Sequence, residues 1–80
     1  MSISVTIGRV TLMQYNTLTN MIAFTVVPDE ISPSKDTDFL LAHDMFNIAQ
    51  FLENAMRNNY TVMVEHEEGQ TYVAAVGSAA

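Results

Sequence analysis

The chain has 80 residues, 49% of them hydrophobic and 15% charged, and nine acidic against three basic side chains give a formal net charge of −6. Nearly half of the residues are apolar, which excludes a disordered acidic tail, and the negative charge disfavours direct binding to nucleic acid or to anionic membranes. There are no cysteines, so disulfides and thiolate metal sites are excluded as well.

The length predicts one domain over residues 1–80, with 77–80 as a frayed tail. A chain this short buries only about 60 to 65% of its unfolded surface, so association with a second copy would enlarge its core. Neither a secretory signal nor an apolar run of roughly 18 residues stands in the sequence. The expected location is the cytoplasm.

The first strand contains a change of side-chain phase. Apolar residues occupy odd positions from Ile3 to Ile7 and even positions from Val10 to Leu12. Two local structures account for the change: Gly8 and the arginine after it form a two-residue hairpin turn, or Gly8 is a β-bulge inside one long strand. We prefer the bulge because arginine is an indifferent second turn residue, but the hairpin stays open.

A polar loop over residues 16–20 separates two further predicted segments, strands over 9–15 and 21–27. Pairing outward from this loop gives three cross-strand pairs that form one largely apolar face: Gln14 with Ile22, Leu12 with Phe24, and Val10 with Val26. Pro28 ends the second strand. An acidic segment over residues 29–38, the connector, follows it.

A helix is predicted from Asp38 to about Asn58, where Asn58-Asn59 stops it. Side chains at positions 36–38 are suited to cap its start. Apolar residues at helical spacing form its central stripe: Leu41, Met45, Ile48, Ala49, Leu52, Ala55 and Met56. Leu40, Phe46 and Phe51 widen this stripe to roughly 220°, more than a core-facing helix requires.

A second hairpin completes the predicted fold, with strands over 60–67 and 70–76 and a turn at Glu68-Gly69. The predicted class is α+β. In this two-layer ββαββ arrangement, one helix packs on a four-stranded, largely antiparallel sheet.

The sheet face turned away from the helix is expected to be apolar, with methionine and tyrosine where a solvated face would carry charges. Such side chains are typical of contact surfaces, and we predict a homodimer through this face. The predicted self-association residues are Met13, Tyr15, Met21, Ala23, Met63, Tyr72, Ala74 and Val76. The alternative is that these residues lie inside a differently assembled sheet.

No motif for catalysis, cofactor binding or metal binding is found, so the chain is expected not to be an enzyme and to have no cofactor. The run Glu65 to Glu68 places one histidine, His66, among three carboxylates. Alternation along a strand sends Glu65 and Glu67 to one face and His66 to the other, so a metal site is not predicted.

The acidic residues gather in the connector and near the last turn: Asp29, Glu30, Asp36, Asp38, Glu65, Glu67 and Glu68. We expect both groups at one end of the domain, where their field would steer a basic partner protein. In size, charge and lack of catalytic motifs, the chain is similar to the small inhibitors that phages and mobile elements use to block nucleic-acid-handling proteins. This is a resemblance of class and not of motif.

The predicted function is therefore that of a small acidic interaction protein. One alternative is an assembly subunit that associates with copies of itself through its apolar face. Another is a small-ligand carrier with a pocket lined by Phe24, Met45, Phe46 and Phe51.

Overall fold

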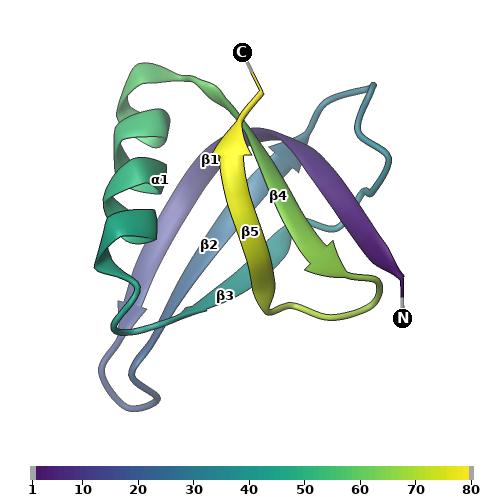
Figure 1. Cartoon of the computed structure of the whole chain (residues 1–80). Helices are drawn as coiled ribbons and strands as arrows, with labels where there is room; N and C mark the ends of the chain where they lie inside the picture. Colours follow the sequence, from purple (N-terminus) through teal and green to yellow (C-terminus); the bar gives the residue numbers. More distant parts are fainter. Residues whose placement is uncertain (1, 80) are drawn as a thin grey trace.

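The protein folds into a five-stranded antiparallel sheet with one helix (Figure 1), in a computed structural model that describes residues 2–79. The elements in chain order are β1 (Ile3–Asn16), β2 (Met21–Pro28), β3 (Asp38–Ala42), α1 (Phe46–Asn58), β4 (Thr61–Glu67) and β5 (Val73–Ser78). Their order across the sheet is β3-β2-β1-β4-β5. The α+β class is confirmed, whereas the predicted four strands in ββαββ order are wrong because β3 was not expected.

Strand β3 lies where the first turn of the helix was predicted. Phe39 and Leu41 are buried at alternate positions, while Asp38 is exposed and Leu40 is half-buried. The helix instead begins at Phe46, after Met45, which caps it without a side-chain hydrogen bond. The predicted caps at 36–38 are wrong, because apolar residues two apart that fit a helical stripe also fit a short strand. The predicted end is confirmed, since Asn59 takes a left-handed conformation there.

Strand β1 is continuous, which excludes the hairpin at Gly8. The register with β2 shifts between Val10 and Leu12, so the bulge lies two to four residues after the glycine. Val10 pairs with Val26 as predicted, but after the bulge Met13 and not Leu12 is opposite Phe24. Inward side chains therefore stand at even positions before the bulge and at odd positions after it.

Gly8 has a different role from the one predicted. It lies opposite Pro28, at the end of the paired stretch of β1 and β2, and its α-carbon packs against the backbone of Val27. A side chain at this position would collide with the Val27 carbonyl group. The glycine is therefore required by the close approach of two strands.

The sheet curls until its two outer strands meet (Figure 1). Leu40 in β3 forms an isolated parallel bridge with Tyr72, next to β5, and its amide donates a 2.9 Å hydrogen bond to the Thr71 carbonyl. Since this is the contact at which the outer strands bridge, the sheet forms a partly open barrel.

One core fills the curled sheet. It consists of Val10, Ile22, Phe24, Val26, Phe39, Leu41, Ala49, Leu52, Ala55, Val62 and Val64. The helix contributes Ala49, Leu52 and Ala55 and packs mainly against β1. Within residues 2–79 no helix is both long and apolar enough to cross a membrane.

The second hairpin follows the prediction in its turn, where Gly69 adopts a positive φ of 79°. The predicted outward position of Val76 is wrong, because an irregularity between Glu65 and His66 in the pairing with β5 places Val76 opposite the buried Val64. The predicted frayed tail is also wrong in part. Residues 77 and 78 belong to β5 and the Ala79 amide donates to the Thr61 carbonyl, while residue 80 lies outside the described residues.

Replacing Gly8 with alanine should lower the free energy of unfolding by about 2 to 3 kcal/mol, because the added methyl group forces two strands apart. A Cβ there would lie 2.8 Å from the Val27 carbonyl carbon and 2.9 Å from the Pro28 Cα atom. Urea denaturation followed by circular dichroism measures the change. Gly77→Ala is the matched control, because a Cβ at Gly77 meets no atom within 4 Å and should leave stability nearly unchanged.

Candidate functional site

The end of the connector and the β4–β5 turn enclose an acidic hollow. Its volume is about 310 Å³, and its lining residues are Lys35, Asp36, Thr37, Asp38, Gly69, Gln70 and Thr71. Both carboxylates come from the connector and the start of β3. The Lys35 ammonium donates to the backbone carbonyls of Asp29 and Glu30, at 2.9 and 3.3 Å, so it is held by backbone oxygens.

A mainly apolar groove adjoins this hollow on the outer surface of β1, β2 and β3. Its volume is about 370 Å³, and its lining includes Leu12, Gln14, Ala23, Thr25, Asp38, Leu40 and Thr71. Asp38 and Thr71 line both the groove and the hollow. The two spaces therefore adjoin at Asp38 and Thr71, with a mainly apolar surface in the groove and two carboxylates in the hollow.

The register of three strands creates the groove. Ala23 lies in the middle strand, between Gln14 of β1 and Leu40 of β3, so a methyl group is flanked by two longer side chains. The bulge in β1 turns Leu12 outward, where it is 57% exposed. The Leu40–Thr71 hydrogen bond brings the β4–β5 turn to the edge of the groove and forms its wall.

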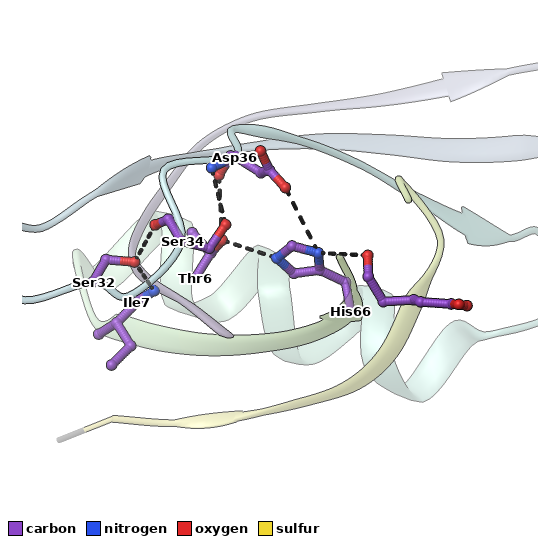
Figure 2. Close-up of polar contacts among 7 residues, drawn as sticks. Thr6, Ile7, Ser32, Ser34, Asp36 and His66 are labelled. Carbon is purple, nitrogen blue, oxygen red and sulfur yellow. Dashed lines mark hydrogen bonds and ion pairs between the residues drawn. The ribbon is translucent and has the colours of Figure 1, made fainter. Parts of the chain in front are cut away.

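A buried polar cluster adjoins the acidic hollow through Asp36, and Figure 2 shows its contacts. The His66 ring is fully buried, with Nε2 at 3.1 Å from the Thr6 hydroxyl and Nδ1 at 3.8 Å from a carboxylate oxygen of Asp36. The Thr6 hydroxyl in turn donates to the Asp36 backbone carbonyl at 3.3 Å. Asp36 thus contacts β1 through its backbone carbonyl and approaches the His66 ring of β4 with its side chain.

The rest of the connector is attached to the free edge of β1. The Asp29 amide donates to the Ile7 carbonyl at 2.8 Å, and the Ser34 amide donates to the Val5 carbonyl at 2.9 Å. Between them the Ile7 amide donates to the Ser32 hydroxyl at 2.8 Å. These bonds replace the strand that β1 lacks on this side and position Asp36 at the hollow.

The predicted self-association residues do not share one surface. Met13 and Val76 pack against the core, and Tyr15 lies opposite the buried Ile22, so their placement on the outer face was wrong, because each follows a register shift that reverses the alternation. Met21 and Ala23 are on β2, whereas Met63 is on β4, across β1. Tyr15 is exposed at the end of its strand, and the other two, Tyr72 and Ala74, are exposed as well. Homodimer formation stays a prediction.

The predicted acidic residues divide into three groups. Asp36 and Asp38 line the hollow, and Glu67 and Glu68 lead into the turn whose next three residues also line it. Asp29 and Glu30 lie at the other end of the connector. Glu65 pairs with Val5 and Ala75 in the sheet, and it lines a separate shallow depression with Met63.

The residues proposed for a carrier pocket are not brought together. Phe24 is buried in the core, whereas Phe46 and Phe51 are 65% and 37% exposed on the helix. Phe46 lines a different depression, beside Tyr15 and Met21.

The alternation predicted for the acidic run is confirmed, because His66 faces inward while Glu67 is exposed.

Sequence reasoning missed the groove and the buried histidine cluster. Leu12 was assigned to the core, Leu40 to the helix, and Thr71 to no site. For His66 the sequence did contain a signal. His66 lies two residues after Val64 in β4, so the alternation of the strand turns its side chain inward. Thr6 shows no such signal, since its partners come from distant segments.

Comparisons with protein-family models, curated proteins and solved structures found no match to this chain.

Thr6→Val should lower the free energy of unfolding by about 1 to 3 kcal/mol, because it leaves the buried Nε2 of His66 and the Asp36 carbonyl without the hydroxyl. Thermal and urea unfolding would measure the loss. Thr61→Val is the matched control at a partly exposed position in β4, and it should have little effect. Equal losses in the two variants would contradict a stabilising role for the cluster.

Proposed function

We propose that this chain is a small non-enzymatic interaction protein that binds an extended, basic segment of a partner protein. The observation that carries the proposal is that the groove and the acidic hollow adjoin each other at Asp38 and Thr71. An apolar floor accommodates aliphatic side chains, and the carboxylates of Asp36 and Asp38 complement a cation.

The connectivity of the sheet supports a binding role. Its partly open five-stranded barrel resembles the OB-fold, in which ligands lie against the second and third strands between the loops that join strands 1–2 and 4–5. The groove lies on β2 and β3 beside the β4–β5 turn, which is the corresponding place. Fold alone does not determine the ligand, so the chemistry of the groove must choose it.

That chemistry favours a polypeptide over a polynucleotide. OB-folds that bind single strands combine a positively charged groove with aromatic side chains on which bases stack. Here no basic side chain lines the groove, and Lys35 in the hollow is already held by backbone carbonyls. With a net charge of −6, the chain repels phosphates and attracts basic proteins.

The partner class that fits this surface is a basic protein that handles nucleic acid. Such proteins present lysine and arginine side chains where phosphates bind. An acidic protein that occupies those side chains would exclude the nucleic acid, and its field would accelerate encounter with the partner. This is the action of an inhibitor that competes by charge, and it requires no catalytic residue.

Neutralising the hollow should weaken binding of a peptide of alternating lysine and valine. The expected loss for Asp36→Asn with Asp38→Asn is about fivefold, from two exposed ion pairs worth roughly 1 kcal/mol together. Chemical-shift changes in two-dimensional NMR spectra measure the affinity and locate the peptide. The control, Asp44→Asn with Glu53→Gln, removes two carboxylates on the β3–α1 turn and on α1 and should bind as the native chain does.

A single-stranded oligonucleotide that bound in the groove more tightly than this peptide would overturn the proposal. So would a peptide affinity that the control variant reduced as much as the Asp36 and Asp38 variant did.

Filling the groove should also weaken binding, because the peptide then loses the apolar floor. Ala23→Phe places a ring between Gln14 and Leu40, and we expect an affinity loss of about tenfold or more for the same peptide, from apolar area that it can no longer bury. Ala74→Phe, at an exposed position next to Val73 in β5, is the matched control. If the filled variant binds normally, the peptide lies elsewhere.

A further inference from the structure

We propose that binding of a cation at the acidic hollow is coupled to release of a proton from His66. This inference rests on the proposed function, because it concerns the regulation of the same site. The shared group is Asp36, whose side chain is 53% exposed on the side of the hollow while one carboxylate oxygen lies 3.8 Å from the fully buried ring.

The contacts of the His66 ring, taken together, require a proton on each ring nitrogen. The single Thr6 hydroxyl proton is donated to the Asp36 carbonyl, so the 3.1 Å contact between Thr6 and Nε2 needs a proton on Nε2. Nδ1 faces only acceptors, the Glu67 carbonyl at 3.3 Å and the Asp36 carboxylate, so it needs a proton as well. Only the imidazolium carries both.

A neutral ring leaves one of these contacts without a proton. With the proton on Nε2, the lone pair of Nδ1 faces the Glu67 carbonyl and the Asp36 carboxylate. With the proton on Nδ1, the Thr6 hydroxyl must turn to Nε2, and the Asp36 carbonyl loses its donor. Loss of the ring proton therefore loosens the hold on Asp36.

Asp36 is the carboxylate that the described structure places against the ring. From β1 the ring meets the Thr6 hydroxyl, and from β3 it meets Phe39, with ring centroids 4.9 Å apart. The residue opposite in β5 is the apolar Val73. On β4 itself the Glu67 backbone carbonyl faces Nδ1, whereas the Glu67 side chain is exposed, and Glu65 lies one position out of phase with His66.

The sign of the coupling follows from competition for one carboxylate. When the His66 ring is charged, it offsets part of the negative charge of the Asp36 carboxylate. The attraction between this carboxylate and a lysine of the partner protein is then weaker. By linkage, a bound lysine makes the ring proton easier to lose to the same degree. Affinity for a basic segment should therefore fall as the pH is lowered and His66 takes up its proton.

The first experiment measures the affinity of the acetylated, amidated lysine–valine peptide across the range in which histidines change charge. Affinity should be about twofold lower at about pH 5.5 than at about pH 7.5 for the native chain, because the charged ring offsets at most the contribution of one of the two carboxylates. It should be independent of pH for His66→Gln. His43→Gln should keep the native pH dependence, because His43 lines a separate depression beside Tyr15. A native affinity that does not change with pH, or a pH dependence that survives in His66→Gln, would overturn the coupling.

The second experiment needs no ligand and no change at a buried position. NMR titration of the two histidine rings, assigned with His43→Gln, should show that His66 takes up its proton at a lower pH in Asp36→Asn than in the native chain. An unchanged His66 titration would overturn the coupling even if His66→Gln fails to fold. Absence of peptide binding at about pH 7.5 would instead overturn the proposed function, and this titration would still decide whether Asp36 and His66 interact.

Discussion

The reversal of side-chain phase in β1 determines which surfaces this protein presents. One strand of 14 residues has two neighbours, β4 along its first half and β2 along its second, and the bulge falls just after the point where one pairing gives way to the other. Before it, Thr6 and Val10 face the interior, and after it Leu12 faces outward. The groove exists because of this reversal, since without it Leu12 would join the core.

The connector satisfies backbone hydrogen bonds along the unpaired edge of β1, and this contact places Asp36 at the candidate site. The first half of β1 has β4 on one side only, so its other edge would expose unpaired backbone groups. The connector satisfies Val5 and Ile7 with a mixture of backbone amides and the Ser32 hydroxyl. Because a connector tied down in this way has a fixed path, it delivers Asp36 to both the His66 ring and the hollow.

Sequence patterns predicted the parts of the fold that depend on local chemistry. The polar turn after β1, the helix stop at Asn59 and the turn at Gly69 follow from residues that tolerate left-handed backbone or lack apolar side chains. The position of the bulge was missed because the glycine that seemed to mark it serves the close packing against Val27. Strand β3 was missed because five residues satisfy helical and extended patterns equally well.

The candidate site was harder to predict, because it depends on contacts between distant segments. Thr6 and His66 are sixty residues apart, and Leu40 meets Thr71 only because the sheet curls. The acidic residues were visible in the sequence, but not the fact that Asp36 faces a buried ring on one side and the hollow on the other. This shared position makes the histidine more than a core residue. An apolar side chain at position 66 would remove the need for a proton, and it would also remove the group whose charge competes with a cation for the carboxylate.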